Sequence, residues 1–304
     1  MKVFKLRPEG DDCIRLTDIN YRRATSSNAP WVISKNGKPA HYAVCPECSN
    51  PIIVIGLDID TRQDKNGRSL SLHARHCPSD VAPEVARYYQ DAYDNCPLAD
   101  PKAFTGEPIK RKPGVFSREI LELLRDEADT VKYFMEDTLG ILLSDEVFQQ
   151  IIEKFIAQEG HLYRSIGKLN LPYAVLFMAK NQTVAPKKQG CKLKNKGENS
   201  PFKQAMLRSK YFEIDQKFYF IKIKKEAPHG VRLNFFFDKH VISASEEKSQ
   251  TLGLVIEEEY NGSKEFLFQC NIDFDFYYFY NTITKKRRER KIAAAALENL
   301  LAEK

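Results

Sequence analysis

Alternation of polar and apolar positions dominates the C-terminal part of the chain. Four stretches repeat with the period of two that is typical of strands, at residues 218–225, 231–238, 251–260 and 264–280. Asn261-Gly262 separates the last two stretches, and a two-residue hairpin turn favours this dipeptide. Residues 264–280 place apolar side chains on one face and polar side chains on the other, and their length predicts a bulge or bend. We therefore predict a mostly antiparallel sheet covered on one face.

Helical spacing marks the segment before this sheet. Apolar residues recur every three or four positions across residues 117–160 and predict two amphipathic helices, the first capped by Ser117. The apolar run at residues 171–179 is consistent with a buried strand or a short helix. Residues 180–210 lack an apolar period and predict an exposed loop, whereas residues 284–303 predict a closing helix.

The first hundred residues contain shorter elements. Asn36-Gly37 is a hairpin dipeptide, and it lies between the first two of three runs that predict strands. These runs are residues 31–34, 42–44 and 52–55. Residues 69–77 predict a short helix, and residues 82–93 predict a longer one.

Cysteine and histidine residues cluster between positions 45 and 77. Cys45-Pro46-Glu47-Cys48 supplies two thiols directly after the predicted hairpin. On a helix, His73 and Cys77 would stand on one face at positions i and i+4. A tetrahedral zinc ion needs such a combination, two ligands from a tight turn and two from a second element. We predict a closed, structural zinc site of Cys45, Cys48, His73 and Cys77.

Two further residues compete for the second pair of ligands. His76 lies three positions after His73, and Cys96 follows the longer predicted helix, so either residue can complete the site. A redox role for the Cys45-Pro46-Glu47-Cys48 motif is another alternative. The thioredoxin-like βαβ pattern that surrounds such redox motifs is missing, which favours the metal.

A family resemblance rests on these residues. Cys45-Pro46-x-Cys48, followed by Pro51-Ile52 and later by His73-x-x-His76, resembles the zinc-finger-like segment of competence CoiA-like proteins. The resemblance covers residues 42–77, about a tenth of the chain. In that family the segment accompanies a PD-(D/E)xK nuclease domain. Glu213-Ile214-Asp215, before a strand that ends at Lys222-Ile223-Lys224, is the part of this chain most like such a core, but no convincing Glu-x-Lys follows a paired aspartate, so the family's catalytic residues are not carried over.

Prolines mark the predicted domain boundary, because four of them lie between positions 97 and 113 without any apolar period. We predict an α+β fold in which residues 1–100 form a small zinc-binding module and residues 101–113 a linker. An α+β domain at residues 114–304 follows. Its predicted parts are helices at 117–160, a basic loop at 180–210, a sheet at 211–281 and a C-terminal helix at 284–303.

Positive charge is concentrated in two segments of a chain whose formal net charge is +6. Residues 180–210 hold nine lysines and arginines against one glutamate, and residues 285–291 hold six against one. The remainder therefore carries net negative charge, a distribution that favours contact with a polyanion. We predict binding of DNA or RNA through Lys187, Lys188, Lys192, Lys194, Lys196, Lys285, Lys286, Arg287 and Arg288.

Two other functions compete with this prediction. Asp273 and Asp275 share a strand face, so a divergent metal-dependent nuclease could use a carboxylate cluster on the C-terminal sheet. Alternatively, the basic segments meet an acidic protein, as in an interaction subunit of a phage or defence complex. In each case we expect a bacterial or mobile-element protein.

Composition bears on the compartment. Hydrophobic residues make up 42% of the chain and charged residues 29%, values typical of soluble globular proteins. The sequence has no run of 18 apolar residues, so we predict no membrane span. The N-terminus lacks the apolar core of a signal peptide. Seven cysteines, three of them isolated in sequence, do not form the even framework of a secreted disulfide protein. We therefore predict a cytoplasmic location.

Overall fold

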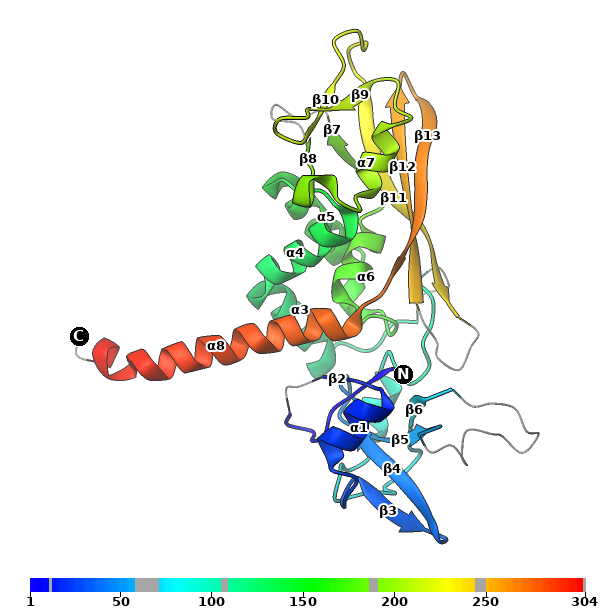
Figure 1. Cartoon of the computed structure of the whole chain (residues 1–304), viewed down its shortest axis with the longest axis vertical. Helices are drawn as coiled ribbons and strands as arrows, with labels where there is room; N and C mark the ends of the chain where they lie inside the picture. Colours follow the sequence, from blue (N-terminus) through cyan, green and yellow to red (C-terminus); the bar gives the residue numbers. More distant parts are fainter. Residues whose placement is uncertain (11–12, 58–70, 105–108, 186–190, 244–249, 303–304) are drawn as a thin grey trace.

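The computed structural model describes residues 1–10, 13–57, 71–104, 109–185, 191–243 and 250–302. Within them the chain is α+β, as predicted, with antiparallel sheets and α-helices (Figure 1). Two lobes are visible: the N-terminal lobe holds the described residues up to position 99, and the C-terminal lobe holds those from position 104 onward. The last helix leaves the body of the molecule between them.

A four-stranded antiparallel sheet forms the N-terminal lobe. Its order is β3 (Val32–Lys35), β4 (Lys38–Val44), β5 (Pro51–Ile55) and β6 (His73–His76). The predicted hairpin between β3 and β4 is confirmed, because Asn36 and Gly37 adopt the left-handed φ values of 54° and 73° that a type I′ turn requires. The helix predicted for residues 69–77 is wrong, since residues 73–76 pair with β5 instead.

Short elements pack around this sheet. β1 (Val3–Phe4) pairs with β2 (Ile14–Arg15), and α1 (Asp18–Thr25) follows with Thr17 as its N-cap. The longer helix predicted for residues 82–93 is wrong and reduces to α2 (Gln90–Asp94). Residues 82–86 form turns whose buried apolar side chains pack with those of β4.

The main sheet of the C-terminal lobe runs in the order β13 (Ser263–Asp273), β12 (Gln250–Tyr260), β11 (Arg232–Ile242) and β7 (Gln182–Ala185). The hairpin at Asn261-Gly262 is confirmed, with φ values of 49° and 77°. The predicted bulge is also present, because the register with β12 shifts at Leu267 of β13. A second, three-stranded sheet consists of β8 (Cys191–Lys192), β10 (Phe220–Ile223) and β9 (Phe212–Ile214).

Five helices share the apolar core of these sheets: α3 (Val115–Asp126), α4 (Ala128–Leu139), α5 (Asp145–Ala157), α6 (Leu171–Met178) and α7 (Pro201–Met206). Residues 117–160 therefore hold three helices and not the predicted two, because the backbone leaves helical geometry at Glu127. Ser117 is not the N-cap of α3. Gly114 is, and the Ser117 hydroxyl exchanges hydrogen bonds with the Gly114 backbone.

The segment predicted as a basic loop contains regular structure. Residues 180–210 include β7, β8 and α7, together with the 3₁₀ turn η3 (Lys194–Gly197); a similar turn, η2 (Gly160–Leu162), follows α5. Val184, Leu193 and Phe202 are buried in the main core and hold this segment to the lobe. Its apolar residues are too widely spaced to produce a period in the sequence.

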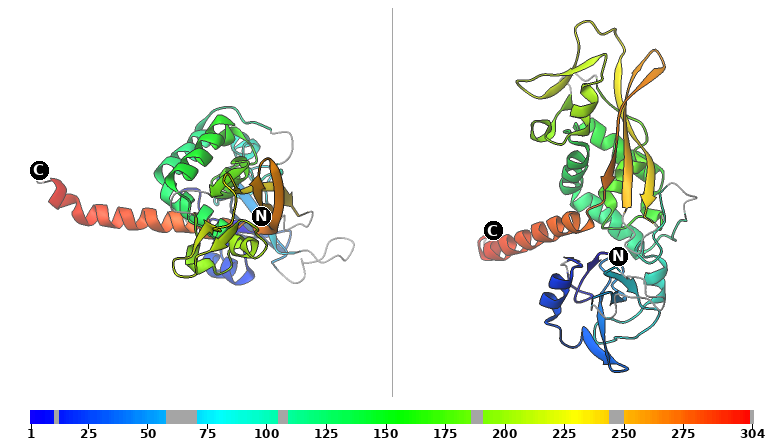
Figure 2. Two further views of the ribbon diagram at one scale, coloured as in Figure 1. Left: turned by 90° about the horizontal axis from the view of Figure 1, so that it is seen from above. Right: turned by 45° about the vertical axis from the view of Figure 1, so that its right-hand side comes forward.

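The final helix, α8 (Phe276–Ala302), begins eight residues earlier than predicted. Asp275 caps it, accepting a hydrogen bond from the backbone N–H of Tyr278 at 2.9 Å. Phe279 and Ile283, four residues apart, are buried against the core, which makes this aromatic segment helical although its sequence also alternates. Figures 1 and 2 show that the rest of α8 extends away from both lobes.

Candidate metal centre

The connection between β4 and β5 presents the two thiols of the Cys45-to-Cys48 motif. Cys45 follows the last residue of β4, and its backbone N–H donates to the carbonyl of Asn50 at 2.9 Å. The Cys45 carbonyl accepts from the N–H of Ser49 at 3.0 Å, and Ser49 has a left-handed φ of 59°. These bonds close a tight turn that holds both sulfurs on the same side.

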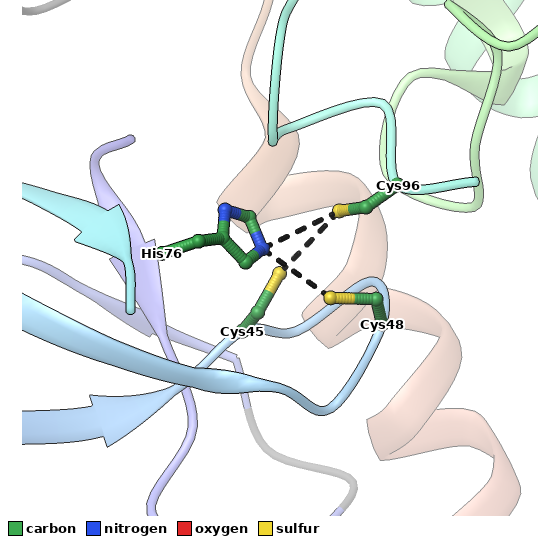
Figure 3. A group of neighbouring side chains, drawn as sticks. All are labelled: Cys45, Cys48, His76 and Cys96. Carbon is green, nitrogen blue, oxygen red and sulfur yellow. Dashed lines mark hydrogen bonds between the residues drawn. The ribbon is translucent and has the colours of Figure 1, made fainter. Parts of the chain in front are cut away.

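His76 and Cys96 complete the group. His76 ends β6 and pairs with Ile52, the second residue of β5, so its ring lies beside the turn. Cys96 follows α2 and approaches from the opposite side (Figure 3). Its sulfur lies 3.7 Å from Cys45 Sγ and 3.6 Å from His76 Nε2, and Cys48 Sγ lies 3.3 Å from the same nitrogen.

All four potential ligand atoms lie within 4.8 Å of one another, so the group could hold a metal ion. In the described part of the chain, this is the only set of three or more histidines, cysteines and carboxylates so placed. Cys45 and Cys96 are fully buried, whereas Cys48 and His76 are partly exposed. Four protein donors leave no position for a substrate, as in structural metal sites.

The second pair predicted from sequence, His73 and Cys77, lies outside this group, which contains instead the two predicted alternatives, His76 and Cys96. The expected helix would have aligned His73 with Cys77, but β6 is a strand, on which successive residues face opposite sides, so His73 and His76 lie on opposite faces. Cys77 is buried among the apolar residues on the other side of the sheet, and burial raises its pKa to about 11. His73 Nδ1 instead lies 2.7 Å from the carbonyl oxygen of Ser71.

Without a metal, the electrostatics of the group allow one thiolate beside two protonated thiols. Burial raises the pKa of the Cys96 thiol, and a hydrogen bond to Cys45 raises that of Cys48. Burial also opposes ionisation of Cys45, yet hydrogen bonds from Cys48, Cys96 and His76 bring its pKa well below the ordinary value. Three thiolates cannot share such a site unless a positive charge neutralises them.

The same turn contains a residue whose role the sequence reasoning missed. Glu47 is 3% exposed and inserts into the C-terminal lobe, where its carboxylate accepts the backbone N–H groups of Lys168 at 3.1 Å and Leu169 at 2.7 Å. Burial raises the pKa of Glu47, which the charge of Lys168 and these hydrogen bonds partly offset. The only sequence signal was an acid between two predicted ligands, in a position usually exposed.

The loop that receives Glu47 is itself held in place. Gly167 lies so close that an added Cβ would come within 2.6 Å of Glu47 Oε1, so only glycine fits there. Arg111 donates from Nη2 to the carbonyls of Tyr163, Arg164 and Ile166, and burial lowers its pKa to about 10. The candidate metal centre therefore sits where the N-terminal lobe docks on a firmly anchored loop.

Comparison with protein-family models, with curated proteins and with solved structures finds no match. The resemblance of residues 42–77 to competence CoiA-like proteins accordingly stays a prediction. None of the described helices has the length and apolar character needed to span a membrane.

The lysines predicted to bind nucleic acid in the first basic segment lie in different environments. Lys187 and Lys188 fall outside the described residues. Lys194 is engaged within the lobe: its Nζ lies 3.2 Å from Asp137 and 3.6 Å from the ring centre of Tyr133. Lys192 and Lys196 are exposed. Among the described lysines of this segment, Lys192 and Lys196 therefore face solvent, whereas Lys194 is held by contacts within the lobe.

The second basic segment is partly neutralised by the C-terminal lobe. Lys286 pairs with Asp129, and Arg287 Nε lies 3.1 Å from the carboxylate of Glu127, which is 1% exposed. Lys285 makes a long ion pair of 3.9 Å with Glu289 on the same helix, and both side chains are exposed. Arg288 makes no ion pair with a described residue. Lys286 and Arg287 therefore anchor α8, while Lys285 and Arg288 remain accessible.

Asp273 and Asp275 do not form a carboxylate cluster in the described structure. Asp275 caps α8 and pairs with Arg15 of β2 at 3.1 Å, so its charge is already used. No group of three or more ligands among the described residues includes either aspartate. The nuclease alternative thus gains no support from these two residues.

Proposed function

We propose that this chain is a nucleic-acid-binding protein stabilised by zinc. The observation that carries the metal assignment is the spacing of the four donors. Tetrahedral zinc with Zn–S near 2.3 Å and Zn–N near 2.0 Å separates two sulfurs by about 3.8 Å, and sulfur from nitrogen by about 3.5 Å. The corresponding distances in the Cys45, Cys48, His76 and Cys96 group are 3.7 Å for sulfur–sulfur and 3.3 and 3.6 Å for sulfur–nitrogen.

Zinc in this site acts as a structural element. Its ligands come from the β4–β5 turn, from the end of β6 and from Cys96 just after α2. A bound ion would therefore join three segments of a lobe that has a small apolar core. The turn also carries Glu47 into the C-terminal lobe. Zinc thereby stabilises both the lobe and its docking. Reduced thiols are required, and all seven cysteines are free, which supports a cytoplasmic location.

Nucleic-acid binding is supported by the charge distribution. The net charge of +6 arises from two basic segments, and some of their side chains are exposed and free of close acidic partners among the described residues. Exposed lysines and arginines of this kind contact phosphates without reading base sequence, and such binding weakens steeply with salt.

Elemental analysis of matched variants tests the metal. We expect one equivalent of zinc per chain in the wild type, in His73→Ala and in Cys77→Ser, and a clear loss in His76→Ala and Cys96→Ser. His73→Ala is the control for His76→Ala, because it changes a histidine three positions away. Cys77→Ser is the control for Cys96→Ser, because it changes another buried cysteine of the same lobe. Zinc that survives His76→Ala, or is lost equally in His73→Ala, contradicts the ligand assignment.

Fluorescence anisotropy tests the partner. We expect labelled DNA or RNA to bind wild-type protein at low salt, with affinity falling linearly on logarithmic axes as salt rises. An absence of binding at low salt refutes the nucleic-acid proposal while leaving the zinc assignment intact.

A further inference from the structure

A groove of about 410 Å³ lies between the two lobes, where α1 faces the start of α8. α1 contributes Asn20 and Arg23, and α8 contributes Tyr277, Lys285 and Arg288. Figure 1 shows α1 beneath the first turns of α8, on the side from which α8 projects. The groove is thus built by two elements that lie more than 250 residues apart in the sequence.

Hydrogen bonds and apolar packing join α8 to the floor of the groove. Asn281 of α8 donates its side-chain amide to the carbonyl of Cys13 at 2.7 Å and accepts the N–H of Cys13 at 3.2 Å. Cys13 is 2% exposed and packs with Val3 and Leu169 in a small apolar cluster between the lobes. The position of α8 relative to α1 is therefore set by a reciprocal pair of hydrogen bonds, not by surface contacts alone.

Every charged side chain among the described residues that line the groove is positive. Arg23, Lys285 and Arg288 are exposed, and neither Arg23 nor Arg288 makes an ion pair with a described residue. Asp11 and Asp12, which precede Cys13, lie outside the described residues. Three cations converging on one concave site from two helices raise the local concentration of an anionic ligand.

An aromatic ring stands at the same site. Tyr277 is 36% exposed, and the Arg15 guanidinium lies 5.2 Å from its ring centre. Arg15 is in turn held by Asp275 at 3.1 Å, so the ring is supported by a fixed neighbour. Exposed aromatic rings next to cationic grooves are the usual platform on which unpaired bases stack.

We propose that this groove binds the backbone of a single-stranded nucleic acid, with Arg23 and Arg288 on phosphates and Tyr277 stacked on a base. This inference rests on the proposed nucleic-acid function and specifies its site and substrate class. A duplex keeps its bases paired and stacked internally, so it cannot use Tyr277, whereas a single strand can enter the concave site and use both features.

Arg23→Gln combined with Arg288→Gln tests the site, with anisotropy measured on a labelled single strand and its duplex across a salt series. We expect the affinity for the single strand to fall about tenfold or more. The slope of the logarithm of affinity against the logarithm of salt concentration should become smaller by about 1.4, since each single-strand phosphate contact contributes about 0.7. Tyr277→Ala should weaken single-strand binding with little change in slope, because it removes stacking and not charge.

A matched control removes the same charge at the far end of the C-terminal lobe. Lys217→Gln with Lys225→Gln changes two exposed lysines flanking β10 and should leave binding unchanged. If the wild type binds and the groove variant binds equally well, the groove is not the binding site, but the proposed function stands. The same conclusion follows if the control variant loses as much affinity as the groove variant. Tighter binding of duplex than of single strand overturns the substrate class. No wild-type binding at all overturns both proposals.

Discussion

The two lobes reach a folded state in different ways. The C-terminal lobe buries one continuous apolar core that runs from Phe104 to Ile283 and includes residues of its main sheet and of every helix from α3 to α8. The N-terminal lobe divides its apolar residues into two small clusters on opposite sides of a four-stranded sheet. Small cores rarely suffice for stability, so the N-terminal lobe depends on its metal centre and on docking.

Docking uses polar contacts from both sides. Glu47 reaches from the N-terminal lobe to two backbone N–H groups, and Asn281 reaches back from α8 to Cys13. Arg15 and Asp275 add an ion pair at the surface. Because these contacts are few and directional, each lobe should respond separately to perturbation of its own core.

The largest expected effect is metal removal. A chelator at neutral pH should unfold the N-terminal lobe and leave the C-terminal lobe folded, since structural zinc binding contributes on the order of 10 kcal/mol. Trp31, the one tryptophan of the chain, lies in the N-terminal lobe, so its fluorescence reports that lobe alone. Hydrogen exchange should show protection lost before residue 100 and kept beyond it.

Unfolding of both lobes together on chelation would contradict this separation. Cys77→Ser serves as the control, because it alters a buried thiol of the same lobe that lies outside the metal group.

The next effect concerns the other core. Phe235→Ala should lower the free energy of unfolding of the C-terminal lobe by about 3–5 kcal/mol, because the ring is fully buried and its removal leaves a cavity. Urea denaturation followed by circular dichroism measures this change. Phe266→Ala on β13 of the same sheet, where the side chain is 54% exposed, should cost under about 0.5 kcal/mol. Loss of zinc from Phe235→Ala would show that the lobes are not independent.

A pH effect is also expected in the C-terminal lobe. His240 is buried, its Nδ1 accepts the N–H of Phe104 at 2.9 Å, and burial lowers its pKa from 6.5 to about 4. As pH falls below about 6.5 the unfolded chain binds a proton that the folded lobe does not, so stability is lost between about 6.5 and 4. The loss amounts to about 3 kcal/mol.

Replacing the imidazole isolates this contribution from that of other titrating groups. The stability difference between wild type and His240→Phe, measured in urea, should shrink by about 3 kcal/mol between pH 7 and pH 4. A difference that stays constant with pH argues that the folded lobe protonates His240 normally.

The smallest expected effect sharpens the contact between the lobes. Glu47→Ala leaves the N–H groups of Lys168 and Leu169 without their acceptor and should cost about 1–3 kcal/mol. Zinc content should not change, and the two amides should exchange faster with solvent. Glu84→Ala, which removes an exposed acid of the same lobe, is the control. Zinc loss in Glu47→Ala would mean that docking and metal binding cannot be separated.

Local patterns predicted much of the fold. Both Asn-Gly hairpins are confirmed, since this dipeptide favours the left-handed geometry that each turn uses. The alternating stretches predicted the antiparallel pairing of β11, β12 and β13, and the Cys45-to-Cys48 motif predicted half of the candidate site. These features depend on residues that are adjacent in sequence, so tertiary structure had little power to change them.

Segments with two compatible patterns were predicted less well. The aromatic run around Phe276 alternates like a strand, yet Phe279 and Ile283 also fit a helix, and packing on α4 selects the helix. Residues 73–76 fit either state, and pairing with β5 makes them a strand. That one change replaced His73 and Cys77 by His76 and Cys96 as the companions of the first two cysteines.

The sequence by itself determined the α+β class, the hairpins, the cysteine pair and the excess of positive charge, because each follows from composition or from neighbours along the chain. Only the tertiary structure decided which histidine and which third cysteine face that pair, that Glu47 docks one lobe on the other, and which cations stay accessible. These outcomes depend on contacts between residues tens to hundreds of positions apart, and such contacts leave no periodic trace in the sequence.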